Sequence, residues 1–371
     1  MAEEHGHGRA CVTVTSEKVK ALARELGFEL AGVTSARPTI ESLFYPVWLE
    51  QGFAAEMDYL KGRRGEMRAD PRSLLPSAQS VICVGMVYNT DLPYSTEVEC
   101  GDRGWISRYA WGEDYHDVLK QKLHKLVERL REEAGPFDYK VCVDTSPLLE
   151  RAYAHRAGLG WIGQNTCLIS EELGSWFFLG EVLTSLELEI DQPAPFRCGT
   201  CTRCIEACPT GAIVPTGQAD GPAYALDSNR CISYWNIELR GPIPEENRAE
   251  VGANLFGCDI CQDVCPWNRD AARTDAEQFQ PKNELPSLAE LAALTEEEFS
   301  ERFKHAPIER ARYRGFLRNV AVAMGNSGER KFLERLKMLA ESPDPVIQEH
   351  AEWAIGRLSG GADSPADPPT I

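Results

Sequence analysis

The sequence has no long apolar run and no excess of positive charge. No stretch approaches the roughly twenty apolar residues that a membrane-spanning helix needs, and no basic region followed by an apolar run opens the chain. We therefore expect neither a membrane span nor a secretion signal. Acidic residues outnumber basic ones by 57 to 39, which gives a formal charge of −18. That charge argues against indiscriminate binding of polyanions, although it allows a local basic surface.

Cysteine is plentiful, with thirteen residues. Without a secretion signal, a reducing cytoplasm is the expected location, and cysteines there serve as thiolate ligands more often than as disulfides. Residues 198–209 read C-G-T-C-T-R-C-I-E-A-C-P, which is the cysteine run of bacterial ferredoxins. Zinc sites also use C-x2-C pairs, but they do not need three cysteines in seven residues followed by a fourth and a proline. The spacing favours iron–sulfur clusters over zinc.

A second, shorter run contains Cys258, Cys261 and Cys265, and Cys231 is the one unassigned cysteine between the two runs. In two-cluster ferredoxins the fourth cysteine of each run ligates the other cluster. This rule predicts two 4Fe-4S clusters. One is held by Cys198, Cys201, Cys204 and Cys265, and the other by Cys208, Cys258, Cys261 and Cys231.

The N-terminal region alternates helical and strand patterns. Residues 80–88 are rich in valine and isoleucine and predict a buried strand, and apolar residues at helical spacing follow over 118–130. Residues 139–144 predict a strand that ends on Asp144, and ligands of α/β sheets bind where strands end. The alternative is an aspartate that only stiffens a turn. The basic segment 61–68 is expected to be a loop, and Ser16 is expected to cap the first helix.

The C-terminal region is helical in pattern. Segments 308–324, 331–339 and 346–358 predict short paired helices of the kind that build HEAT-type solenoids. The first of these segments carries clustered arginines, which predict a phosphate-binding face unless they are only a solvated helix surface: Arg310, Arg312, Arg314 and Arg318.

These patterns together resemble the epoxyqueuosine reductase family, which comprises cobalamin-dependent iron–sulfur enzymes that finish queuosine in transfer RNA. The resemblance covers nearly the whole chain. It is carried by V-D-T-S-P at 143–147, G-L-G-W-I-G at 158–163, G-S-W-F-F-L-G-E at 174–181, C-I-S-Y-W-N-I-E-L-R-G-P-I-P at 231–244, F-G-C-D-I-C-Q-D-V-C-P-W-N at 256–268 and R-G-F-L-R-N-V-A-V-A-M-G-N-S-G at 314–328.

The resemblance implies an α+β multidomain chain. Its expected parts are an α/β cobalamin-binding catalytic domain (1–190), a ferredoxin-like domain with two 4Fe-4S clusters (191–285), a HEAT-like helical domain that binds RNA (286–358) and a disordered tail (359–371). Residues 1–10 are also expected to be disordered.

The resemblance assigns the proton donor to Asp144, and a desolvated carboxylic acid there would have a raised pKa. By position in the matching motifs, the other expected cobalamin contacts are Arg68, Ser107, Asn165, Ser233, Arg240 and Asp259. No D-x-H-x-x-G motif is present, so a histidine lower ligand to cobalt is not expected.

The expected activity is the reduction of epoxyqueuosine to queuosine at the wobble position of transfer RNA, the last step of queuosine biosynthesis. The expected partners are transfer RNA carrying epoxyqueuosine and an external low-potential electron donor, with no membrane, and the chain is expected to be a monomer. A corrinoid reductive dehalogenase, a non-enzymatic ferredoxin-type electron carrier and a helical scaffold stabilised by clusters are the alternatives.

Overall fold

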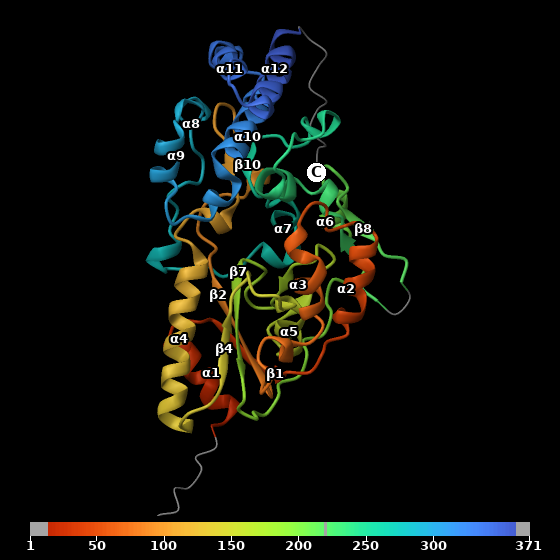
Figure 1. Cartoon of the computed structure of the whole chain (residues 1–371), viewed down its shortest axis with the longest axis vertical. Coiled ribbons are helices and arrows are strands. Elements are labelled where there is room, and N and C mark those ends of the chain that lie inside the picture. The colour runs from red at the N-terminus through yellow and green to blue at the C-terminus, as the bar shows by residue number, and fades with distance from the viewer. Residues whose placement is uncertain (1–13, 219–220, 361–371) are drawn as a thin grey trace, which may run out of the picture.

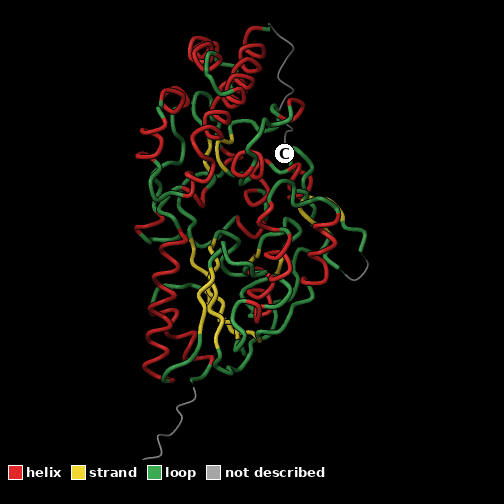
Figure 2. The backbone as a smooth tube through the Cα atoms, viewed as in Figure 1, coloured by secondary structure: helices red, strands yellow, loops and turns green. Residues whose placement is uncertain are grey.

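The computed structural model describes residues 14–218 and 221–360 (Figure 1). The expectations for residues 1–10 and for all but the start of the 359–371 tail lie outside the described residues. Figure 2 shows strands gathered in one half of the molecule and helices dominating the other. None of the described helices is long and apolar enough to cross a membrane.

A four-stranded sheet forms the centre of the N-terminal half. Its order is β1 (Leu30–Ser35), β2 (Ser80–Val87), β7 (Phe177–Thr184) and β4 (Tyr139–Cys142). Every neighbouring pair is antiparallel. The expected α/β sheet is therefore wrong in its strand direction, and the rule that ligands bind where the strands of such sheets end does not apply to Asp144.

Helices cover both faces of this sheet (Figure 1). On one face, α1 (Ser16–Glu25) and α4 (Tyr115–Ala134) pack against alternate residues of β2, including Ile82 and Val84. On the other face, α5 (Glu150–Arg156) packs against the intervening residues, including Val81 and Cys83. Since helices cover both faces, β2 is buried at every position, which explains its largely apolar sequence.

Two local predictions in this half are wrong. Thr15, not Ser16, caps α1, because its hydroxyl accepts a hydrogen bond from the Lys18 amide at 3.2 Å. The basic segment expected to be a loop forms the short helix α3 (Gly62–Met67), which follows α2 (Glu41–Glu50).

The cysteine runs lie in a region of short elements. The helices α6 (Arg203–Glu206) and α7 (Ile260–Asp263) contact each other. Around them lie the hairpins β5 (Trp161–Ile162) with β6 (Leu168–Ile169) and β8 (Ile213–Pro215) with β9 (Tyr224–Leu226), the parallel pair β3 (Trp105–Ile106) with β10 (Asn254–Phe256), and a single π-helical turn at Tyr234–Glu238.

The C-terminal helices are α8 (Leu288–Ala293), α9 (Glu296–Arg302), α10 (Arg312–Asn326), α11 (Leu333–Ala340) and α12 (Pro345–Ser359). Their apolar core is continuous with Trp105, Trp111 and Phe256 from the preceding regions. The core therefore crosses the boundary expected after residue 285. A capping box opens α9, since Thr295 and Glu298 exchange hydrogen bonds of 3.2 and 2.8 Å.

Arg318 does not belong to a solvent-facing surface, which corrects its predicted role as an RNA contact. Its side chain is 1% exposed and donates hydrogen bonds to the backbone carbonyls of Trp235, Leu239 and Gly241. Next to it, Asn319 donates to the carbonyls of Asn236 and Leu255, both at 2.8 Å. The two residues tie α10 to the segments that carry Cys231 and Cys258.

Replacing Arg318 by Met should lower the free energy of unfolding by about 3 kcal/mol, because three buried carbonyls would be left without their donor. Denaturant titration under anaerobic conditions measures the change. Arg314→Met is the matched control, since Arg314 is about half exposed, and it should change stability by less than about 1 kcal/mol. Equal stability of the two variants would contradict the buried role of Arg318.

Candidate functional site

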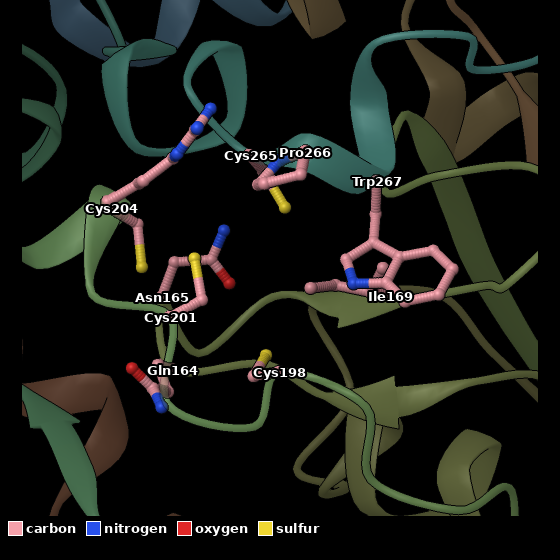
Figure 3. A pocket seen from close by; sticks show the side chains of 10 residues that line it. Gln164, Asn165, Ile169, Cys198, Cys201, Cys204, Cys265, Pro266 and Trp267 are labelled. Carbon is pink, nitrogen blue, oxygen red and sulfur yellow. The ribbon is translucent and has the colours of Figure 1, made fainter.

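Four cysteines from both runs surround one cavity (Figure 3). Cys198, Cys201 and Cys204 come from the first run, and Cys265 reaches the same cavity from the second. Figure 3 shows the four sulfur atoms around a common space. The Trp161 indole nitrogen lies 3.4 Å from the Cys198 sulfur. The structure thus brings together the four residues that the crossed spacing rule predicts.

The other four predicted cysteines also gather. Burial raises the pKa of the Cys258 thiol, and neighbouring Cys231 and Cys208 raise it further. A hydrogen bond to Cys167, burial and the nearby Cys258 and Cys231 raise the pKa of Cys261. Buried thiols that raise one another's pKa form a set that a cation in their midst would convert to thiolates. Backbone amides also point at these sulfur atoms, for example Ala212 N at 3.3 Å from Cys208.

Both sets fit iron–sulfur clusters by the chemistry of their donors, which are thiols alone. Among the described residues, no three His, Cys, Asp or Glu side chains are arranged to hold a single metal ion. The cysteines of the described part of the chain are free thiols. Cys167 was not predicted to lie near a cluster, yet it hydrogen bonds with Cys261.

Asp144 lies just after β4, with its backbone in the left-handed region (φ 51°). Its side chain is 51% exposed, and its Oδ2 lies 3.1 Å from Nε2 of His116. The other ring nitrogen of His116 lies 2.7 Å from Asp114 Oδ1. The imidazole is therefore held between two carboxylates, and Asp144 has a partner that the sequence did not predict.

In this arrangement the pKa of Asp144 is lowered, whereas the rise was expected for a carboxylic acid beside a bound corrinoid. The partial desolvation of Asp144 acts to raise its pKa, but the hydrogen bond from His116 and the positive charges of His116 and Arg310 bring the pKa below its ordinary value. Against the effect of burial, the hydrogen bonds to Asp114 and Asp144 and the charges of these two carboxylates raise the pKa of His116 to about 9. At neutral pH the proton of this pair lies on the imidazole, and Asp144 is a carboxylate.

Two further carboxyls lie behind Asp144, and sequence reasoning missed both. The Asp144 amide donates to Glu150 Oε1 at 2.5 Å. Burial and the Asp144 charge raise the pKa of Glu150 to about 8. Burial and the Glu150 charge raise the pKa of Glu181 well above its ordinary value. A glutamate in the otherwise apolar stretch 177–184 was the signal available in the sequence.

Basic and aromatic side chains from distant segments meet beside Asp144. Arg64 of α3 donates to the carbonyl of Thr145 at 2.6 Å. Arg310, just before α10, pairs with Glu238 and lies 5.3 Å from the Tyr59 ring centroid. The Arg310 charge is close enough to help lower the pKa of Asp144. The two basic segments singled out in the sequence thus flank one site.

Three of the six residues expected to contact cobalamin use their polar atoms within the protein. Asp259 is 1% exposed and accepts from Ser107, from the Trp105 indole and from the Arg108 amide. Arg68 is 7% exposed and donates to the carbonyl of Arg64 at 2.9 Å. These hydrogen bonds give Arg68, Ser107 and Asp259 a structural role inside the protein.

The remaining three lie at different places around the site. Asn165 lies beside the first cysteine cavity and donates to the Cys261 carbonyl at 3.2 Å. Ser233 hydrogen bonds with Cys231. Arg240 is exposed and donates to the Arg310 carbonyl at 3.0 Å, so it lies with the clustered arginines.

Of the four predicted RNA-binding arginines, Arg310, Arg312 and Arg314 are exposed. Arg314 pairs with Asp344 at 3.0 Å. These three residues and Arg240 form an exposed basic surface, the arginine group.

Two family models match the chain. One, described as epoxyqueuosine reductase QueG, DUF1730, matches residues 68–145, and the other, a 4Fe-4S double cluster binding domain, matches residues 197–268.

The chain is 41% identical to the epoxyqueuosine reductase of Xanthomonas campestris, over 93% of this chain and 96% of that protein. Among solved structures, an epoxyqueuosine reductase with an epoxyqueuosine-modified stem loop of tyrosine transfer RNA is 32% identical (TM-score 0.83) and covers 92% of this chain and 89% of its own. The Bacillus subtilis epoxyqueuosine reductase, with its catalytic aspartate loop swung out of the active site, is 32% identical (TM-score 0.81) and covers 92% and 90%.

The crossed grouping predicts that Cys265→Ser damages the cluster of the first run, because Cys265 faces Cys198, Cys201 and Cys204. We expect iron content to fall by about half after anaerobic purification, and electron paramagnetic resonance to show the loss of one centre. Cys231→Ser is the matched comparison, and it should damage the other centre. Loss of the same centre in both variants would contradict the grouping.

Proposed function

The chain belongs to the epoxyqueuosine reductase family, and from that membership we propose that it reduces epoxyqueuosine in transfer RNA to queuosine. The observation that carries the proposal is the site around Asp144. A carboxylate paired with a histidine lies between two basic segments, in a chain whose neighbouring region gathers eight cysteines into two sets. The reductive dehalogenase alternative is a distant structural match only. A plain electron carrier has no use for the Asp144 pair.

Two 4Fe-4S clusters fit the two cysteine sets, whose donors are thiols alone. Electrons from an external low-potential donor would enter through them. The external donor and a monomeric state stay predictions.

Cobalamin fits its expected contact residues less completely than the clusters fit the cysteines, since Arg68, Ser107 and Asp259 form hydrogen bonds within the protein. Asn165, Ser233, Arg240 and backbone groups are the residues that would hold it. His116 is engaged by carboxylates at both ring nitrogens, so it does not serve as a lower ligand. When bound, cobalamin supplies a low-valent metal that accumulates two electrons for cleavage of the C–O bonds.

The protein's own contribution is the proton. Asp114 fixes the imidazole of His116 through Nδ1, so that Nε2 points its proton at Oδ2 of Asp144. We propose that Asp144 passes this proton to the departing epoxide oxygen and acts as general acid through its histidine partner. The left-handed backbone of Asp144 is held by its amide hydrogen bond to Glu150, which orients the carboxylate.

RNA docks, in this proposal, on the arginine group and on Lys61, Arg63 and Arg64. Guanidinium groups suit phosphate oxygens because they keep their charge and bond in pairs. With these groups on either side of Asp144, a base splayed from the anticodon arm would reach the carboxylate. The C-terminal helices form a HEAT-like support for the RNA.

Asp144→Asn keeps the shape of the side chain but cannot transfer a carboxyl proton. Single-turnover conversion of epoxyqueuosine RNA by the reduced holoenzyme should fall by about a hundred- to ten-thousand-fold, the usual range for a general acid. Iron and cobalamin content should not change. Asp138→Asn, at the other end of β4, is the control and should react at the normal rate. Near-normal turnover of Asp144→Asn would leave Asp144 with a turn-stiffening role alone.

The exposed arginines give a test of RNA docking. Replacing Arg312 and Arg314 together by Ala should weaken RNA binding and flatten its salt dependence by about one unit of slope for each phosphate group that is no longer bound. Lys337→Ala with Arg357→Ala is the control, because it removes the same charge from α11 and α12. Equal affinities and salt slopes for the two double variants would place the RNA elsewhere.

A further inference from the structure

Glu181 is a fully buried acidic side chain. It is 0% exposed, and apart from the Glu150 carboxyl no group among the described residues is placed to donate to either of its oxygens. Directly across the sheet it is paired with Cys83 on β2 and with Cys142 on β4. Both neighbours are buried thiols, and α5 covers this face of the sheet. A charge in such surroundings is strongly disfavoured unless something neutralises it.

Glu150, the first residue of α5, lies within hydrogen-bonding reach of Glu181. Two carboxylates in this position repel each other, but one shared proton turns the contact into a hydrogen bond between an acid and its conjugate base.

Among the charged and titratable groups around the pair, one cation acts on Glu150 and none acts on Glu181. Asp144 adds negative charge from the β4–α5 loop, while His116 of α4 is the cation that acts on Glu150. Tyr115 of α4 also faces Glu150, but its hydroxyl is neutral because burial raises its pKa well above the ordinary value. The other cations nearby, Arg156 and Lys140, act on Cys83 and Cys142 respectively.

The chemistry of the proposed function requires a second proton. An epoxide takes up two electrons and two protons as both of its C–O bonds break, and it leaves an alkene and one water molecule. The His116–Asp144 pair holds one proton at neutral pH. The second must reach the same carboxylate after the first has left it.

We propose that Glu150 and Glu181 share a stored proton and pass it to Asp144, so that the protein itself holds both protons that one reduction consumes. This inference rests on the proposed function. The Asp144 amide donates to Glu150, which places Glu150 next to Asp144, and Glu181 is paired in the sheet with Cys142, two residues before Asp144. Both act through Asp144 and are positioning residues. Between turnovers, solvent water protonates the Glu150–Glu181 pair again.

The first test detects the shared proton without turnover. Infrared spectra of the anaerobic holoenzyme near pH 7 should contain the carbonyl band of a buried protonated carboxylic acid. The band should disappear in Glu181→Gln, because the amide can donate to Glu150 and let it ionise. It should persist in Glu187→Gln, which changes an exposed glutamate that follows the same strand. Absence of the band from the unchanged protein would overturn the proposal.

The second test is the pH profile of single turnover. Because the pKa of Glu150 is about 8, the wild-type rate should fall as pH rises through that value. Near pH 7 the rate of Glu181→Gln should be at least about tenfold lower. At low pH it should approach the wild-type rate, because solvent then supplies protons readily. A loss by the same factor at every pH would mean a merely structural role and would overturn the proposal.

Glu150→Gln provides a second variant with the same expected profile, should Glu181→Gln fail to fold. Failure of the proposed function is distinguishable from failure of this inference. A wild-type protein that does not convert epoxyqueuosine RNA would contradict the function, whereas the infrared band reports the shared proton independently of any substrate.

Discussion

The buried hydrogen bonds of Arg318 and Asn319 are the constraint on which the arrangement of the site depends. These two neighbours on α10 hold the carbonyls of the π-helical turn after Cys231 and of the strand before Cys258. Asn236 extends the network by bonding the Gly257 amide at 2.9 Å. Two of the four cysteines of one set are thus positioned by a helix far along the chain. The same helix begins at the arginine group, so the placement of cysteines and of basic side chains shares one support.

The grouping of the cysteines could be predicted from spacing, because the short helices α6 and α7 leave few ways to bring their sulfur atoms together. The inward direction of the Arg318 side chain could not be predicted from the sequence. Residues 316–325 of α10 are all buried, so this part of the helix has no polar stripe. The sequence pattern therefore does not distinguish a buried arginine there from an exposed one. Likewise, β2 is buried at every position because helices cover both faces, and its largely apolar sequence does not separate antiparallel from parallel strands. The histidine partner of Asp144 comes from another element and left no local signal.

Charge is distributed unevenly in this acidic chain. Its basic groups meet next to Asp144 from segments that are far apart in sequence, and the acidic side chains of Glu150 and Glu181 are also close to that residue. Desolvation opposes its ionised form, whereas the hydrogen bond and charge of His116 and the charge of Arg310 favour it. Small movements of either neighbour would therefore shift the proton between Asp144 and His116.

The crossing of cysteines between the two runs has a consequence for biosynthesis of the protein. Each set of four draws cysteines from both runs, so neither is complete until the second run has left the ribosome. A nascent chain that ends before Cys258 carries thiols without a closed site for iron. Cluster insertion must then follow synthesis of more than two thirds of the chain, and a truncation before Cys258 would abolish both centres rather than one.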